Sequence, residues 1–166
     1  MKLSKMLKLK NRLAGELTRL KEMVPGINIV EDGRTHEYNI TDIWVMVERR
    51  AMELALLKAC IANSNSGILA ESDGIVKKSQ WFRIFHVAEI KGMIDTLKTI
   101  RVKNGTFQES TGYGAPVIER NFESELRQQD LDLMRSVLEQ KIDQYQEEID
   151  EYNATVFCSI VDSITI

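Results

Sequence analysis

The hydrophobic residues between positions 130 and 156 recur at every third or fourth position. On a helix, this spacing places all of them on one stripe, and from residue 138 onward the steps alternate between four and three, as in a coiled coil. The stripe consists of Leu131, Met134, Leu138, Ile142, Tyr145, Ile149, Tyr152 and Val156. From residue 139 to 151 all remaining positions are charged or carry an amide. The pattern predicts a long amphipathic helix that needs a partner helix.

The first part of the chain shows the same spacing. Its apolar positions are Leu3, Met6, Leu13, Leu17, Leu20 and Val24, and Lys10 is the one polar residue at this spacing. This pattern predicts a helix from Ser4 to Val24. We expect Pro25-Gly26 to stop it, because proline disfavours helical geometry in the residue before it.

Two more helices are predicted in the middle of the chain. Asn39 or Thr41 can cap the first of them, which continues to Asn63. Ser79 can cap the second, which runs to Ile100 and is apolar over the widest arc, so we expect it to be the most enclosed helix. The fourth and longest helix, which carries the stripe described above, is expected to begin near residues 119 to 123.

The segments between the predicted helices carry turn signals. Residues 27–38 suggest a small β-hairpin turning at Asp32-Gly33, with an ordered loop as the alternative. Residues 67–76 suggest a second two-strand turn at Asp73-Gly74. Residues 104–116 form the longest glycine-rich interruption, which we expect to be a connector. The predicted fold is therefore mainly α, with four helices, two of them long, antiparallel and coiled-coil-like, and with small β-hairpins at the connections.

Length and composition limit the number of domains, the partners and the location that we expect. The 166 residues fit one helical domain, 1–166. A net charge of −3 gives no general attraction to nucleic acid, and we expect no nucleic-acid partner. Cys60 and Cys158 lie far apart in apolar runs and are expected to be buried, reduced thiols. No secretory signal or membrane-length apolar run is apparent, so the expected location is the cytoplasm.

Charge is distributed unevenly between the two ends of the chain. Residues 1–22 carry seven Lys or Arg residues against two Glu residues, whereas residues 130–152 carry eight Asp or Glu residues against two basic ones. Opposite charges favour pairing of the first helix with the last. The pair can form within one chain or between chains, and the sequence leaves both alternatives open.

The C-terminal tail, residues 154–166, is unusually apolar for a chain end. It can dock as a strand on a sheet edge, for example in a neighbouring subunit, or continue the helix into an apolar contact. Both alternatives indicate self-assembly. The predicted oligomer interface consists of Leu138, Ile142, Tyr145, Ile149, Tyr152, Val156, Phe157 and Ile160.

Candidate chemistry is sparse. His36-Glu37 and His86, with Glu89 three residues later, suggest a metal ligand or a base, but neither has further ligands at a recognisable spacing. Gly112-Tyr113-Gly114 lacks the Gly-Lys-Ser/Thr of a phosphate loop. The acidic pairs are expected to be solvated, because neighbours one or two apart on a helix do not face each other; these pairs are Asp130 with Asp132 and Glu147 with Glu148. We predict no catalytic residue, no cofactor and no metal site, and hence no enzyme.

The order of features resembles a known family. The residues that carry the resemblance are the opening MKLSKMLKLKNRLAGELTRLKEM, the turn from Asn28 to Gly33, the helix end IANSNS, the second Asp-Gly turn and the closing LEQKIDQYQEEIDEYNATV. Over about the first 156 residues this layout is similar to that of the septicolysin-like family of small bacterial proteins. The resemblance implies long helices, helical hairpins and self-association, and it transfers no catalytic residue.

The sequence thus predicts a homo-oligomeric structural or interaction protein, assembled through its amphipathic helices, whose partner is itself. The alternative is a membrane-active, cytolysin-like protein, as the family name suggests. A vesicle-leakage assay separates the two functions, because only the alternative predicts leakage from anionic vesicles.

Overall fold

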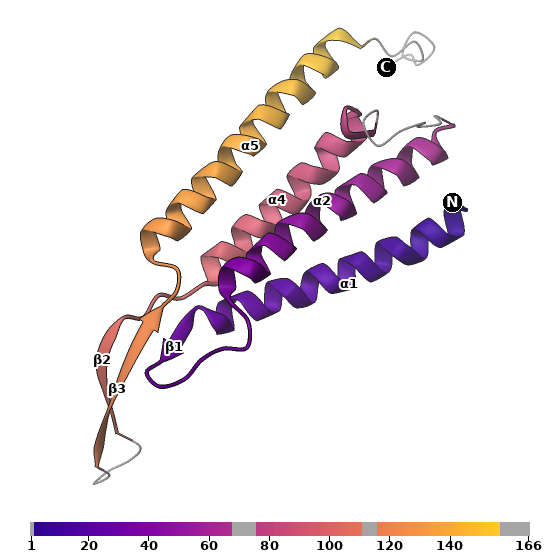
Figure 1. Ribbon diagram of the computed structural model, residues 1–166. Helices are drawn as coiled ribbons and strands as arrows, with labels where there is room; N and C mark the ends of the chain where they lie inside the picture. Colours follow the sequence, from indigo (N-terminus) through magenta and orange to yellow (C-terminus); the bar gives the residue numbers. More distant parts are fainter. Residues whose placement is uncertain (1, 68–75, 111–115, 157–166) are drawn as a thin grey trace.

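The computed structural model describes residues 2–67, 76–110 and 116–156. Four helices form the body of the molecule (Figure 1): α1 (Leu3–Ile27), α2 (Ile40–Asn65), α4 (Gln80–Thr99) and α5 (Gln128–Thr155). A small antiparallel sheet lies at one end, with the strands β1 (Ile29–Glu31), β2 (Gly105–Ser110) and β3 (Val117–Ser124). The mainly helical fold with four helices and small β-elements at their connections confirms the predicted class.

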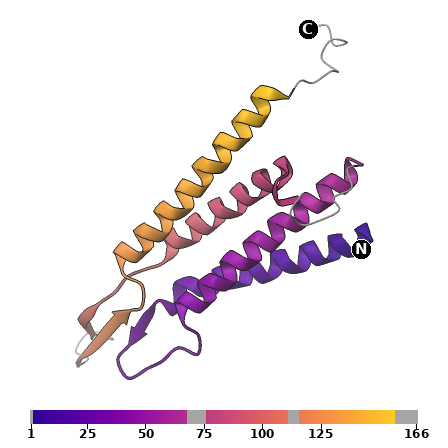
Figure 2. The same ribbon diagram turned by 45° about the horizontal axis from the view of Figure 1, so that its top comes forward.

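The helices are arranged in the order α1, α2, α4, α5 (Figures 1 and 2). α1 packs on α2, α2 packs on α4, and α5 packs on α4, which also touches α1. α4 therefore contacts three helices, which agrees with the wide apolar arc in its sequence. α1 and α5 lie at opposite edges of the bundle, so the described residues do not pair the first helix with the last inside one chain.

The predicted stop at Pro25 is wrong, because α1 continues to Ile27. A proline this close to the end of a helix removes only one late hydrogen bond. Val24 is completely buried just before the proline, and Ile27 packs against the same core just after it. Packing of these two side chains holds the last turn in helical form.

Side-chain caps begin two of the helices as predicted. The Asn39 side chain accepts a hydrogen bond from the Thr41 backbone N–H at 2.7 Å, and Ser79 Oγ accepts one from Phe82 N–H at 3.2 Å. The predicted start of the fourth helix near residues 119–123 is wrong. Those residues belong to β3, where residues 119–122 pair with β2 and Glu123 pairs with Val30 of β1, and α5 begins only at Gln128.

The sheet has the strand order β1-β3-β2, and both pairings are antiparallel. The hairpin predicted within residues 27–38 is wrong, because the partner of β1 is the distant β3, with Ile29 opposite Ser124. Gly33, at φ +78°, makes the turn that follows β1. The glycine-rich connector predicted at 104–116 instead begins with β2, which pairs with β3 from Gly105 opposite Phe122 onward. Most of the other predicted hairpin, at 67–76, falls outside the described residues.

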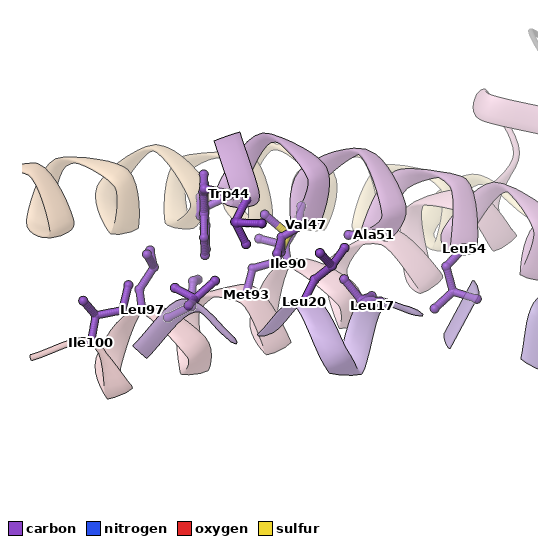
Figure 3. Close-up of a cluster of buried hydrophobic side chains, with 14 of the residues drawn as sticks. Leu17, Leu20, Trp44, Val47, Ala51, Leu54, Ile90, Met93, Leu97 and Ile100 are labelled. Carbon is purple, nitrogen blue, oxygen red and sulfur yellow. The ribbon is translucent and has the colours of Figure 1, made fainter. Parts of the chain in front are cut away.

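The main hydrophobic core lies where α1, α2 and α4 meet (Figure 3). Its labelled members are Leu17, Leu20, Trp44, Val47, Ala51, Leu54, Ile90, Met93, Leu97 and Ile100. Leu131 and Leu138 of α5 join the same core over α4. Burial of these apolar side chains is the main source of stability of the fold.

Asn28 joins the helices to the sheet, and its side chain is completely buried. Its amide nitrogen donates to the carbonyl oxygens of Arg101, at 2.9 Å, and Leu126, at 3.2 Å. Its amide oxygen accepts from the Leu126 backbone N–H at 2.8 Å. One side chain therefore satisfies peptide groups from the segment after α4 and from the segment before α5.

Candidate functional site

A hollow of about 400 Å³ lies between α2 and α5, and we call it the α2–α5 hollow. α4 forms its floor with His86, Ile90 and Met93. The two walls consist of Val45, Glu48, Arg49 and Met52 from α2 and of Leu138 and Lys141 from α5. The hollow exists because α5 packs chiefly on α4 and leaves the outward side of α2 open.

The α2 wall presents apolar side chains to solvent. Val45 is 57% exposed and Met52 is 40% exposed, and the two residues are seven positions apart, so they share one helix face. Met46 is also exposed. Single exposed apolar residues are normal on a protein surface, but Val45 and Met52 also line the same hollow.

A second hollow, also of about 400 Å³, lies between α1 and α2. Its lining residues, which define the α1–α2 hollow, are Met6, Leu9, Arg12, Leu13, Arg50, Glu53, Leu56, Leu57 and Cys60. Arg50 spans it, with one contact to Glu16 at 3.1 Å and another to Glu53 at 2.5 Å. α2 therefore contributes a wall to two hollows, one on each side of its outward face.

His86 is the one titratable group on the floor of the α2–α5 hollow, and it is only 4% exposed. Its Nδ1 lies 3.2 Å from the Tyr145 hydroxyl, and its ring lies 5.1 Å from that of Phe82. Burial, followed by the positive charge of Lys141, lowers the pKa of His86 to about 4. Burial likewise raises the pKa of Tyr145. Both groups are therefore neutral at pH 7, and together they form a packed polar pair between α4 and α5.

The polar groups on the walls of the α2–α5 hollow have structural partners in most cases. Glu48 accepts a hydrogen bond from the Trp44 indole at 3.2 Å, and Arg49 donates to Glu53 at 2.9 Å. Lys141 makes no ion pair within the described part of the chain. Among the described residues that line this hollow, none pairs a nucleophile with a base.

The predicted interface stripe divides into two parts. Leu138 is buried and Ile142 and Tyr145 pack against the core of the same chain, and the Ile149 carbonyl accepts from Gln80 at 3.5 Å. Tyr152 and Val156 are exposed and remain available to a partner. Phe157 and Ile160, like the rest of the predicted tail beyond Val156, lie outside the described residues.

Arg83 of α4 reinforces the contact with α5. Its guanidinium forms an ion pair with the Glu148 carboxylate. Together with the Gln80 to Ile149 hydrogen bond and the His86 to Tyr145 pair, this contact holds the C-terminal half of α5 onto the beginning of α4. The first half of the stripe therefore serves folding within the chain.

The other candidate residues have ordinary structural roles. His36 Nε2 donates to the Ile29 carbonyl oxygen at 2.9 Å. Glu89 pairs with Lys58 at 2.5 Å and does not orient His86.

Two of the acidic candidates of α5 accept local hydrogen bonds. Asp130 accepts from the Arg127 backbone N–H at 2.8 Å, and Asp132 accepts from Gln128 at 3.1 Å. Gly112-Tyr113-Gly114 and Cys158 lie outside the described residues, and Cys60 is half-buried. Among the residues that the structure describes, no three His, Cys, Asp or Glu side chains converge on a possible metal position.

Within the described ranges, no helix is both long enough and apolar enough to cross a bilayer.

Comparison of the chain with protein-family models, with curated proteins and with solved structures found no match. The similarity to the septicolysin-like family therefore stays a prediction.

Proposed function

We propose that this protein is a homo-oligomeric structural or interaction protein whose amphipathic helices pack against those of a second copy. The observation that carries the proposal is the outward face of α2, where Val45 and Met52 are exposed and line the α2–α5 hollow. Covering these side chains removes apolar surface from water, which favours association.

The shape and composition of this face suit a helix as its partner. A hollow between two helices whose lining includes Val45, Met52, Ile90 and Leu138 accepts the apolar stripe of a third helix. Methionine adapts its shape to a partner, and Met52 and Met93 both line the hollow. A second copy supplies such helices itself, because Leu3 and Leu7 on α1 and Leu133 and Val137 on α5 are exposed.

Substitution of Val45 by glutamate tests the proposal. Val45→Glu places a charge in the proposed contact and removes an apolar side chain that association would bury, so we expect association to weaken by about tenfold or more. The measurement is the mass distribution by sedimentation over a range of concentrations. Val117→Glu is the matched control, because Val117 on β3 is also 57% exposed but lies away from both hollows.

The control is expected to associate as the wild type does. Equal association of Val45→Glu and the wild type would remove the α2 face from the interface. A wild-type protein that remains a single chain at every concentration would contradict the proposed function as a whole.

A further inference from the structure

The two edges of the bundle carry opposite charge. α1 has six Lys or Arg residues against two Glu residues, a net charge of +4. α5 has eight Asp or Glu residues against two basic ones, a net charge of −6. Because these helices occupy opposite edges (Figures 1 and 2), one edge of the molecule is positively charged and the other is negatively charged.

The positive charge of α1 is concentrated on one face. Lys5, Lys8, Arg12 and Arg19 follow one another at steps of three, four and seven residues, which places them on a single line along the helix. We call this line the basic stripe, and all four residues are exposed. Arg12 lies 3.7 Å from Glu16, whereas the other three make no ion pair with any described residue.

A surface depression lies along the first part of the basic stripe. Lys5, Lys8, Leu9 and Arg12 line a depression of about 400 Å³ on α1. Its lining combines one apolar side chain, Leu9, with three cationic ones. A helix with acidic residues at its surface fits such a site better than a basic or purely apolar one does.

The negative charge of α5 is arranged in the same way. Glu139, Asp143, Glu147 and Asp150 follow at steps of four, four and three residues and form the acidic stripe. All four residues are exposed. Asp143 and Glu147 make no ion pair within the described chain, and Glu139 has only the 3.6 Å contact with Arg135 in its own helix.

The acidic stripe is separate from the residues that hold α5 in place. Leu138, Ile142 and Tyr145 face the core, while Asp143 and Glu147 point away from it. Glu148, the acidic residue that binds α4 through Arg83, is not part of the stripe. Association through the acidic stripe therefore leaves the internal packing of the chain intact.

We propose that the basic stripe of one copy packs alongside the acidic stripe of the next copy, so that the chains associate head to tail. This inference rests on the proposed homo-oligomeric function and adds the way in which the copies are ordered. The stripes cannot meet inside one chain, because α1 and α5 lie at opposite edges. Two copies of the same stripe repel each other, which disfavours a two-fold contact of α1 with α1 or of α5 with α5.

Head-to-tail contacts have a consequence for the assembly. Each copy uses one edge to bind the copy before it and the other edge to bind the copy after it. Such heterologous contacts produce a ring when the rotation closes and a filament when it does not. Because exposed charges are screened by salt, high ionic strength is expected to weaken this contact.

Charge reversal at each edge tests the inference. The first variant is Lys5→Glu with Lys8→Glu, and the second is Asp143→Lys with Glu147→Lys. Each variant alone brings like charges together at every contact, so we expect its self-association to be about tenfold weaker or more than that of the wild type. Sedimentation measures the association, and circular dichroism checks that the helices are retained.

Combining the two charge-reversed stripes, by mixing the variants or in one chain, tests the contact most directly. An equimolar mixture of the two variants restores opposite charges at every contact, as does a chain that carries all four substitutions. Both are expected to associate like the wild type. Lys77→Glu with Lys91→Glu is the control, because it changes the net charge equally at exposed lysines away from the two stripes. This control is expected to leave association unchanged.

The outcomes separate this inference from the proposed function. A wild-type protein that associates while the reversed variants associate equally well overturns only the head-to-tail contact. Failure of both the mixture and the four-fold variant to recover association also overturns it. A wild-type protein that stays a single chain overturns both the contact and the proposed function.

Discussion

Replacement of Asn28 by alanine is expected to lower the free energy of unfolding by about 3 kcal/mol. Asn28 is completely buried, and its side chain makes hydrogen bonds to Arg101 and to both backbone groups of Leu126. Alanine leaves these peptide groups without a partner and away from water, which is costly for each of them. The measurement is urea unfolding of both proteins at one fixed protein concentration.

Asn11→Ala is the control for this prediction. Asn11 is an exposed residue of α1, where alanine is a favourable helix former, so we expect a change within about 0.5 kcal/mol. If Asn28→Ala and Asn11→Ala unfold at the same urea concentration, Asn28 does not hold the sheet to the helices.

The second large expected effect is a loss of stability in mild acid that depends on His86. The pKa of His86 is about 4 in the folded chain, against 6.5 for a free histidine. Between these values the unfolded chain binds more protons than the folded one, so folding stability falls as the pH is lowered. The part of the free energy of unfolding that depends on neutral His86 is fully present above pH 6.5 and is lost by about pH 4. We expect this loss to be about 2 to 3 kcal/mol.

His86→Gln isolates this effect, because glutamine is polar but does not titrate. We expect the difference in stability between the wild type and His86→Gln to shrink steadily from pH 6.5 to pH 4. Titration of the carboxylates changes the stability of both proteins equally, so it does not affect the difference between them. Parallel pH profiles of the two proteins would show that His86 is not held neutral by burial.

Lys141 provides an independent check on the same site. Its positive charge is the second cause of the low pKa of His86, after burial. Lys141→Gln is therefore expected to raise the pKa of His86, as measured by NMR titration of the imidazole. An unchanged value would leave burial as the only cause.

The helices could be predicted because their apolar spacing is a local property of the sequence. The caps at Asn39 and Ser79 were predictable for the same reason, since each acts within three residues of itself. The error at Pro25 arose because burial of Val24 outweighs a local preference. Local signals therefore locate the helices better than they locate the ends of helices.

The sheet could not be predicted in this way. Residues 29–31 pair with residues 122–124, and no local pattern relates segments so far apart in the chain. β3 is also rich in charged residues, so its sequence resembles the polar start of a helix more than a buried strand. The alternation expected of a half-buried strand is weak here because most of β3 is exposed.

Only part of the candidate site could be predicted from the sequence. The apolar stripe of α5 could be found, but spacing alone does not distinguish a partner helix of the same chain from one of another chain. Leu138 proves to face α4. Val45 and Met52 were missed because α2 is apolar on several faces. Their position could have been recognised from the spacing, because neither lies on the helix face formed by Trp44, Val47, Ala51 and Leu54. All four residues of that face are buried.

The mass of the wild-type protein in solution tests the account most directly. A single chain has a mass of 19.0 kDa. Because exposed apolar side chains and two complementary charged edges favour contact with a second copy, we expect sedimentation equilibrium to give a multiple of this mass that dissociates on dilution. A mass of 19.0 kDa at every concentration up to the solubility limit would contradict self-association as the function of this molecule.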